Sequence, residues 1–502
     1  MTAPPRHLIA SERDSVGIAL APLAAGEAVG GITLAEPIAA GHKFAVRPHQ
    51  PGDAVTKFGQ PIGQASAAIP VGAHVHTHNV AFAASDAAPA IASRIVEPPP
   101  RRAEFLGFHR PDGRVGTRNF IGILTSVNCS ASVARRIAAH FTPERLAPFP
   151  NVDGVIAFSH MSGCGMAKDG RGMDNLRRTI GGYARHPNFA AVLIAGLGCE
   201  VNQIDPLLAD QGLTPGAMLR SLTIQDAGGT KAAIAAGIAA VEAMLPLANA
   251  AQRAPADAAN LTLGLQCGAS DGYSAITANP ALGRAADLLV AAGGRVVLSE
   301  TPEIFGAENL LLERARDTTI ADALCARIDW WLAYARGDGQ SLNNNPSPGN
   351  IAGGITTILE KSLGAVAKAG TSPLGAVIDY AAPINVPGLT FMDTPGYDPC
   401  SATGQIAGGA NLIAFTTGRG SVFGSKPAPT LKLASNSALA ARMADDIDID
   451  CGRLITGQAT LDELGEEIFA ALLETASGRA SKSEENDLGE EEFVPWVPGA
   501  AY

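Results

Sequence analysis

The sequence predicts an α/β protein in which a small all-β region precedes α/β domains with mainly parallel sheets. Residues 5–80 lack helical periodicity and hold short β-like runs separated by glycine. After residue 103, continuous apolar runs alternate with helical patterns, as expected of buried parallel strands and their crossover helices. With 502 residues, 46% of them apolar, the chain is long enough for about three domains. We expect these domains over residues 1–95, 103–250 and 256–502.

The N-terminal region is expected to form a small all-β module of short strands and to end in an extended linker. Val96–Arg102 contains three consecutive prolines, which favour an extended conformation. The expected strands are Ser15–Leu20, Ile32–Leu34, Lys43–Ala45 and Ala54–Phe58, with Gly59 and Pro61 in a turn.

The rest of the chain repeats a pattern of apolar strand, glycine or cysteine turn, and helix. It starts with a strand at Phe120–Val127 and a helix at Ala131–His140. Further expected strands are Gly154–Ser159, Ala190–Ala195, Leu261–Leu265, Arg295–Leu298, Leu389–Met392 and Asn411–Thr416. A helical pattern covers residues 462–477, and we expect the acidic tail with Glu484, Glu485 and residues 490–492 to be a solvated extension.

Composition excludes several classes of function. A net charge of −11 repels nucleic acid and anionic lipid, so we expect no nucleic-acid partner and no membrane association. We recognise no secretory signal and no apolar run that approaches the 18 or more residues of a membrane span. The seven cysteines are widely spaced, without a CxxC pair, which indicates a cytoplasmic protein with free thiols. We further expect a homo-oligomer.

Two sets of residues are candidates for binding a metal. His74, His76 and His78 alternate, so on a strand they would project from one face at the spacing of a metal site. The other set is four cysteines that each follow a predicted strand, where parallel sheets bind ligands: Cys129, Cys164, Cys199 and Cys267. The histidines favour a mononuclear ion, and the cysteines favour sulfur-ligated iron or an iron–sulfur cluster.

Nucleotide binding is not supported, whereas several polar, glycine-rich loops suggest an anionic substrate. The third glycine of a dinucleotide fingerprint would fall at Val201, and the sequence has no Gly-Lys dipeptide for a phosphate-binding loop. Arg118 and Arg419 lie in glycine-containing loops. A guanidinium there can bind a carboxylate through two parallel hydrogen bonds. Asn119 and Asn350 lie in similar loops and are further candidates for substrate binding.

These motifs, in their order along nearly the whole chain, resemble those of the altronate and galactarate dehydratase family. Segments that carry the resemblance include His74–Asn79, Asp112–Asn119, Val127–Ala131, Gly163–Gly165, Gly196–Glu200, Thr277–Gly283, Asn345–Asn350, Glu360–Gly364 and Thr416–Gly420. The sequence departs from the family pattern at Ala269 and Ala275, where glycine is usual, at Asn344, and at Cys451, where alanine is usual. These departures put the substrate in doubt rather than the reaction class.

The resemblance implies an N-terminal SAF domain and a lyase that dehydrates a sugar acid to a 2-keto-3-deoxy acid with Fe²⁺, with Mn²⁺ as another divalent candidate. A sulfolactate sulfo-lyase is the alternative, and a sugar-acid-binding protein without turnover is a third hypothesis. Dehydration needs a base for a weakly acidic α-proton and an acid for the leaving hydroxyl. Lys361, with a pKa lowered by neighbouring arginine, and His160 are our candidates for the base, and Glu303 or a metal-bound water is the candidate acid.

Overall fold

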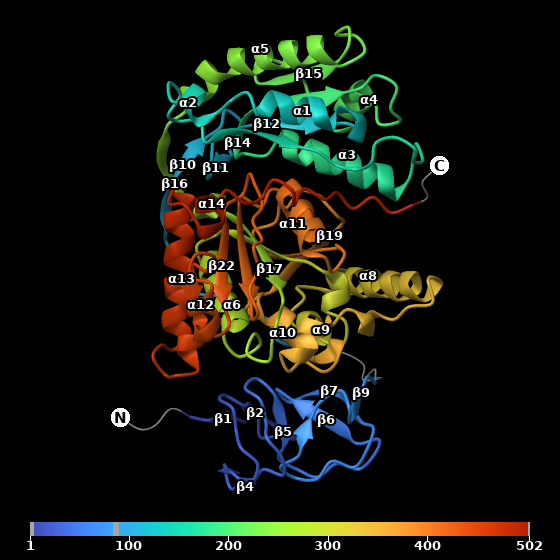
Figure 1. The fold of residues 1–502 in the computed structure, drawn as a ribbon, viewed down its shortest axis with the longest axis vertical. Coiled ribbons are helices and arrows are strands. Elements are labelled where there is room, and N and C mark those ends of the chain that lie inside the picture. Colours follow the sequence, from blue (N-terminus) through green and yellow to red (C-terminus); the bar gives the residue numbers. More distant parts are fainter. Residues whose placement is uncertain (1–4, 84–89, 500–502) are drawn as a thin grey trace.

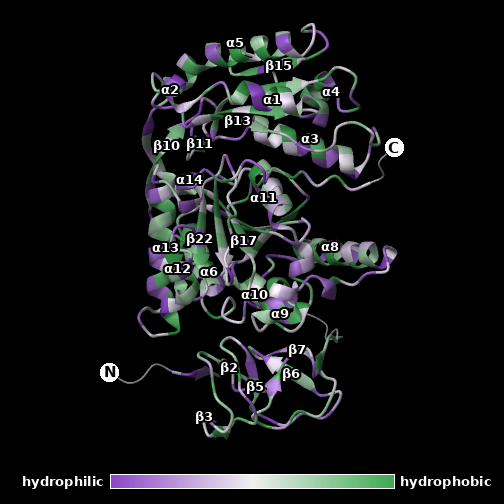
Figure 2. Ribbon diagram, viewed as in Figure 1, coloured by the Kyte–Doolittle hydropathy of each residue, from purple (hydrophilic) through white to green (hydrophobic). Residues whose placement is uncertain are grey.

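The computed structural model describes residues 5–83 and 90–499, which form a small β domain and two larger domains built on parallel sheets. The three lie one after another along the long axis of the molecule, with the third domain in the middle (Figure 1). The predicted fold class is therefore confirmed. The continuous apolar strands of both parallel sheets stand out in green in Figure 2.

The N-terminal domain consists of short antiparallel strands. One sheet has the order β1-β2-β5-β8, a second has the order β6-β7-β9, and β3 pairs with β4. Pro61, expected in a turn, lies inside β7, while Gly59 does form the turn with a φ of +70°. The strands are β1 (His7–Leu8), β2 (Val16–Ala19), β3 (Ala28–Val29), β4 (Ile32–Thr33), β5 (Lys43–Ala45), β6 (Ala54–Lys57), β7 (Gln60–Ala65), β8 (His74–Val75) and β9 (Val80–Ala81).

A small antiparallel sheet joins the two larger domains. Its central strand β10 (Glu104–His109) pairs with β11 (Val115–Gly116) and with β16 (Arg253–Asp257). Because β10 enters the second domain and β16 leaves it, the chain passes into and out of that domain at one place.

The second domain has a four-stranded parallel sheet in the order β13-β12-β14-β15. Its strands are β12 (Phe120–Thr125), β13 (Gly154–Phe158), β14 (Phe189–Gly196) and β15 (Leu219–Thr223), and the 3₁₀ turn η1 (Asn128–Ser130) follows β12. The helices are α1 (Ala131–Ala138), α2 (Pro143–Leu146), α3 (Arg171–Ala184), α4 (Ile204–Asp210) and α5 (Thr230–Asn249).

Helix α5 is long and apolar enough to cross a membrane, although we recognised no stretch of that kind in the sequence. By length and composition α5, with a mean hydropathy of 1.6 over its apolar window, resembles a membrane span. It packs on α1 and on the second-domain sheet, where Val241 and Met244 are fully buried. The apolar residues of α5 therefore contribute to the core of the second domain.

The third domain has a seven-stranded parallel sheet in the order β19-β20-β18-β17-β21-β22-β23. The strands are β17 (Thr262–Gly268), β18 (Arg295–Leu298), β19 (Leu374–Ile378), β20 (Gly388–Met392), β21 (Leu412–Thr417), β22 (Thr430–Ala434) and β23 (Ile449–Asp450). The helices are α6 (Ala278–Ala291), α7 (Asn309–Leu312), α8 (Thr318–Gly337), α9 (Pro348–Ala352), α10 (Ile358–Ala367), α11 (Asp398–Ala407), α12 (Ser437–Arg442), α13 (Leu461–Ala476) and α14 (Lys482–Glu485). Four 3₁₀ turns complete it: η2 (Ala258–Asn260), η3 (Thr301–Glu303), η4 (Leu342–Asn344) and η5 (Cys451–Leu454).

The C-terminal tail is not a solvated extension, contrary to our expectation. It runs between the second and third domains (Figure 1), and Phe493 packs against Phe158 and Tyr183 in a core shared by both. Glu484 also forms an ion pair with a buried arginine of the second domain. The tail therefore helps to hold the two domains together.

Candidate active site

A buried group of charged residues lies at the carboxyl ends of the third-domain strands. Cys267 lies at the end of β17, Glu300 and Glu303 follow β18, and Asp398 begins α11 after β20. Helix α10 contributes Lys361 to the same group, and Lys368 directly after the helix joins it. Strand ends of a parallel sheet converge, which is why residues more than a hundred positions apart meet here.

Lys361 is held at the edge of this group by two oxygen atoms. Its Nζ lies 2.7 Å from Oε1 of Glu303 and 2.6 Å from Oδ1 of Asn345. Burial alone would lower the pKa of Lys361, but the Glu303 carboxylate outweighs it and raises that pKa above its usual value. The predicted lowering of the lysine pKa is therefore wrong, and the side chain is held as an ammonium group.

Lys361 in turn lowers the pKa of the Glu303 carboxyl group. Burial would raise the pKa of its carboxyl group, but Lys361 holds that pKa below its usual value. Its second oxygen, Oε2, is buried and has no hydrogen-bond partner among the described residues. Glu303 is thus an ionised carboxylate with one free acceptor atom, the opposite of the acid that the sequence suggested.

Glu300 and Cys267 lie deeper, beside Lys368. The Lys368 Nζ is 2.9 Å from the Cys267 Sγ and 3.5 Å from Oε2 of Glu300. Burial raises the pKa of the Cys267 thiol to about 11, and burial together with the charge of Glu303 raises that of Glu300 well above its usual value. Glu300 also has a φ of +70°, a left-handed conformation that is costly for a residue other than glycine.

Asp398 is a further titratable group that sequence reasoning missed. Burial, followed by the negative charge of Glu303, raises the pKa of this carboxyl group to about 7. The cluster therefore holds one carboxylate with a lowered pKa and others with raised values. Such a division is typical of sites that transfer protons.

The residue before Lys361 fixes helix α10 to the N-terminal domain. Glu360 Oε2 lies 2.9 Å from Lys43 Nζ and its Oε1 lies 2.8 Å from Lys57 Nζ, and all three side chains are almost fully buried. Lys43 also donates to the carbonyl of Gly354. The two lysines thus hold the N-terminal domain against the segment that carries the active-site lysine.

The three predicted histidines gather, though not along one strand. Strand β8 ends at Val75, and His76 and His78 lie in the turn that follows. His42, which the sequence analysis missed, joins them: its Nδ1 is 3.0 Å from Nε2 of His74. The ring centroids of the neighbouring pairs are 5.0–5.4 Å apart. Burial is the largest cause of the lowered pKa of His42 and of the pKa values of about 4 for His74 and His76.

Arg419 lines a cavity of about 430 Å³ where the N-terminal and third domains meet. Arg442 and Asp271 line it too, and so does Ala352, whose carbonyl is 3.3 Å from Nε2 of His42. Asn350 does not reach this cavity, because its side chain caps α9 at Ser347 and donates to the carbonyl of Ser270. The cavity that Arg419 lines therefore adjoins a residue that contacts His42, and Asn350 has a positioning role.

Ala269, one of the departures from the family pattern, lies beside the same loop. Its φ is +51°, the left-handed region that favours glycine, which explains why glycine suits this position. Its carbonyl accepts hydrogen bonds from the backbone N–H groups of Gly418 and Arg419. The loop around Arg419 is therefore held by the residue two positions after Cys267.

The structure places Arg118 and Asn119 away from both groups. The Arg118 guanidinium is buried between two domains, where it binds the Glu484 carboxylate at 2.6 and 2.7 Å and donates to the carbonyls of Thr117, Thr475 and Arg479. The Asn119 side chain donates to the carbonyls of Asn151 and Ala248. Both positions join secondary structure elements and leave no free group for a substrate.

His160 also lies apart from Lys361, in the second domain. Its ring nitrogens interact with the Thr125 carbonyl at 3.0 Å and the Ser162 hydroxyl at 3.1 Å. Burial lowers the pKa of His160 to about 4. It lines a separate cavity beside Asn128 and Phe493.

The four candidate cysteines do not form one group. Cys267 is buried in the third domain, whereas Cys129, Cys164 and Cys199 are exposed on the second domain. Among the described residues, the one set of three or more ligand atoms within 4.8 Å of one another is Cys267, Glu300 and Glu303. A shared four-cysteine site is therefore ruled out by their positions.

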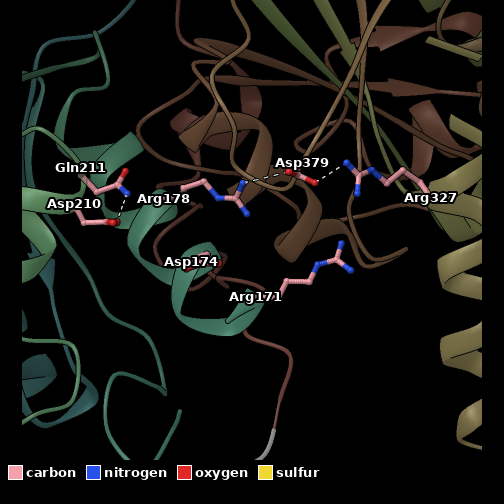
Figure 3. Close-up of a pocket in the computed structure, with 7 residues that line it drawn as sticks. All are labelled: Arg171, Asp174, Arg178, Asp210, Gln211, Arg327 and Asp379. Carbon is pink, nitrogen blue, oxygen red and sulfur yellow. Dashed lines mark hydrogen bonds and ion pairs between the residues drawn. The ribbon is translucent and has the colours of Figure 1, made fainter. Parts of the chain in front are cut away.

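A larger cleft, of about 550 Å³, lies between the second and third domains (Figure 3). The Asp379 carboxylate lies there between Arg178 and Arg327, at 3.7 and 2.8 Å. Arg171 points into the same cleft and forms an ion pair with Asp393. Because its arginines already bind acidic side chains of the protein, we do not assign the substrate to this cleft.

Three family models match almost the whole chain in order. The altronate/galactarate dehydratase SAF domain matches residues 5–83, the D-galactarate dehydratase/altronate hydrolase second domain matches residues 107–249, and the D-galactarate/altronate dehydratase C-terminal domain matches residues 258–501.

Individual proteins give the same picture. An altronate dehydratase of Escherichia coli (strain K12) is 38% identical over 484 residues, 95% of this chain and 96% of that protein. A galactarate dehydratase (L-threo-forming) of the same organism is 36% identical over 89% of this chain and 88% of its own length. A (2R)-sulfolactate sulfo-lyase subunit beta of Chromohalobacter salexigens is 32% identical over 78% of this chain and 96% of its own length.

Proposed function

The chain belongs to the D-galactarate/altronate dehydratase family, and from this premise we propose that it dehydrates an aldonate, with altronate as the first choice, to a 2-keto-3-deoxy acid. The observation that carries the proposal is the buried Lys361–Glu303 pair at the strand ends of the third domain. The family match makes the protein a carbon–oxygen lyase, and the pair provides an ionised carboxylate beside an ammonium group.

The reaction removes the proton from C2 and the hydroxyl group from C3 of a 2,3-dihydroxy acid. The free Oε2 of Glu303 is the proposed acceptor of the C2 proton, because the Lys361 ammonium keeps this carboxyl group ionised. The same ammonium stabilises the negative charge that develops on the substrate carboxylate. Asp398, with a pKa of about 7, is the proposed donor of a proton to the leaving hydroxyl.

We propose that Arg419 recognises a carboxylate of the substrate. It lines the cavity at the domain boundary with a second guanidinium, Arg442, so an anion is favoured there despite the negative charge of the whole chain. The segment of residues 342–361 joins this cavity to the proton-transfer pair, because it carries both Ala352 and Lys361.

We assign the metal to the histidine cluster of His42, His74, His76 and His78. Neutral imidazoles are the form that binds metal, and the buried Nδ1 of His76 has no hydrogen-bond partner among the described residues. The Nδ1 of His42 and the Nε2 of His74 are already 3.0 Å apart. No three ring nitrogens of the cluster, whose four residues the structure describes, lie within 4.8 Å of one another, so binding a single ion through three imidazoles requires the rings to turn. When bound, Fe²⁺ would act as a Lewis acid toward the substrate's oxygen atoms.

The carboxylate group of Glu300 and Glu303 is not our choice for the metal. Lys368 Nζ already lies near Cys267 and Glu300, and Lys361 Nζ lies against Glu303. The ammonium groups of these two lysines thus neutralise the buried carboxylates, so a metal ion is not needed to balance their charge.

Two alternatives remain testable. The first is loss of sulfite from sulfolactate, which the more distant match to a sulfo-lyase subunit supports. The second is binding of a sugar acid without turnover, which would make the protein a sensor. The experiment is an anaerobic assay with Fe²⁺ of altronate, galactarate, other aldonates and sulfolactate. It measures both 2-keto acid and sulfite.

We expect 2-keto-3-deoxy acid from altronate at a higher kcat/KM than from galactarate. Sulfite from sulfolactate with no turnover of any sugar acid would overturn the dehydratase proposal. Calorimetric binding of altronate without product would instead support the sensor. We expect a cytoplasmic homo-oligomer, which size-exclusion chromatography with light scattering tests.

A further inference from the structure

Three cysteines of the second domain occupy equivalent positions on neighbouring strands. Cys129 lies in η1 after β12, Cys164 follows β13, and Cys199 follows β14. In the sheet, β12 lies between β13 and β14 and is hydrogen-bonded to both. Because the strands are parallel, all three cysteines lie at the same edge.

Backbone hydrogen bonds join the three cysteine loops directly. The N–H of Asn128 donates to the carbonyl of Ser162 at 2.9 Å, and the N–H of Asn202 donates to the carbonyl of Gly163 at 3.0 Å. The Asn202 side chain also donates to the carbonyl of Ser126 at 3.1 Å. In each loop, a residue no more than three positions from the cysteine thus forms a hydrogen bond to one of the other two loops.

The loops approach so closely that one position requires glycine. Gly163, next to Cys164, has a φ of +98°, and a Cβ atom there would clash with the Ser126 carbonyl and with Val127. On the other side, the buried Glu200 carboxylate accepts hydrogen bonds from the Ser126 hydroxyl at 2.7 Å and from the Gly198 N–H at 2.6 Å. The arrangement of the loops is therefore built into the fold.

The exposure of these thiols is unusual. Cysteine is among the most frequently buried residues, yet Cys129, Cys164 and Cys199 are all exposed, whereas the remaining four cysteines are buried or partly buried. Packing therefore does not account for three thiols at one edge. Ligation of a soft metal centre does.

We propose that Cys129, Cys164 and Cys199 bind an iron–sulfur cluster, a site separate from the metal of the proposed reaction. A single tetrahedral ion with metal–sulfur bonds of about 2.3 Å needs its sulfur atoms about 3.8 Å apart. The three sulfur atoms do not all lie within 4.8 Å of one another. A cluster offers a different iron to each thiolate and so spans the wider separation.

Binding requires no oxidant or reductant. Iron and inorganic sulfide are supplied as a preformed cluster. Each thiol displaces one terminal ligand from an iron atom and transfers its proton to that ligand, so that one iron–ligand bond replaces another. Cys267 belongs to the other sheet, so the fourth position of a four-iron cluster has no thiolate from this chain.

The test uses the full chain purified without oxygen and then given a preformed iron–sulfur cluster. We expect acid-labile sulfide bound to the protein and broad visible charge-transfer absorption. C129S, C164S and C199S should each lose both signals. C325S, which changes a partly buried cysteine on α8, is the matched control and should keep them.

Stoichiometric zinc without sulfide would overturn the proposal, and so would unchanged sulfide and absorption in all three serine variants. Circular dichroism and thermal unfolding must show that the variants are folded. The double variant H76A/H78A separates this proposal from the proposed function, because it should lose the ferrous ion of the histidine cluster and keep the visible absorption. Loss of the absorption in that variant would assign the chromophore to the histidines and also overturn the proposal.

Discussion

Lys361 and Glu303 form a buried ion pair in which Nζ lies 2.7 Å from Oε1, although the residues belong to different elements 58 positions apart. The side chains are only 10% and 5% exposed, so water screens the interaction little. Each residue shifts the pKa of the other toward its charged form. The pair is the centre of the proposed chemistry.

Replacing either member should abolish most of the activity. We expect K361M and E303Q each to lower kcat by a factor of about 10²–10⁴, the usual contribution of a positioned acid or base. Because the two groups act as a unit, the double variant should be little worse than the single ones. Steady-state kinetics with altronate measures this, and K231M, at an exposed position on α5, is the control. Additive losses in the double variant would contradict the proposed pair.

Asp398 should make stability depend on pH in a defined direction. Its folded-state pKa of about 7 lies above the unfolded value, so the folded protein holds a proton that the unfolded chain releases. The contribution is fully present below about pH 4 and is lost as pH rises toward 7. Urea unfolding at several pH values should show the wild type losing stability relative to D398N over this range. Parallel pH curves for the two proteins would show that Asp398 has an ordinary pKa.

Arg118 should matter for stability and not for catalysis. R118K keeps the charge but cannot form the two parallel bonds to Glu484 and the three bonds to carbonyl groups. We expect the free energy of unfolding to fall by about 1–3 kcal/mol, because buried acceptors lose their donors. The kcat/KM of the folded variant should equal that of the wild type. A large loss of kcat/KM at unchanged stability would show that Arg118 binds the substrate.

Replacing Arg419 should lower activity and leave stability unchanged, the opposite of what we expect for Arg118. Its guanidinium is exposed at the domain-boundary cavity, so R419K should leave the melting temperature nearly unchanged. If Arg419 holds a substrate carboxylate, kcat/KM should fall by a factor on the order of ten to a thousand, as about 1.5–4 kcal/mol of transition-state binding is lost. Wild-type kinetics in R419K would remove this residue from the site.

Metal binding should depend on the histidine cluster. H76A/H78A should lose Fe²⁺ and activity together, whereas H140A, in the second domain, should keep both. Treating the wild type with a chelator should abolish turnover, and added Fe²⁺ should restore it. Iron analysis after desalting gives the stoichiometry. Unchanged mononuclear iron in the double variant would show that the metal is bound elsewhere.

Much of the fold could be predicted because its signals are local. The central strands β12 and β17 are buried on both faces and therefore read as continuous apolar runs, and the predicted helix at 131–140 corresponds to α1. The helix at 462–477 begins with a capping box formed by Thr460 and Glu463. The family resemblance, carried by short motifs, is likewise confirmed.

The sequence by itself thus determined the fold class, the family and most of the residues that could carry chemistry. Only the tertiary structure decided which of them meet. Arg118 and Arg419 lie in similar loops, yet Arg118 meets Glu484, 366 positions away, while Arg419 faces a cavity. The pKa of Lys361 depends in the same way on Glu303. Such contacts follow from how strands and domains are placed in space, and local sequence patterns carry no information on the charge that a distant segment brings to a side chain.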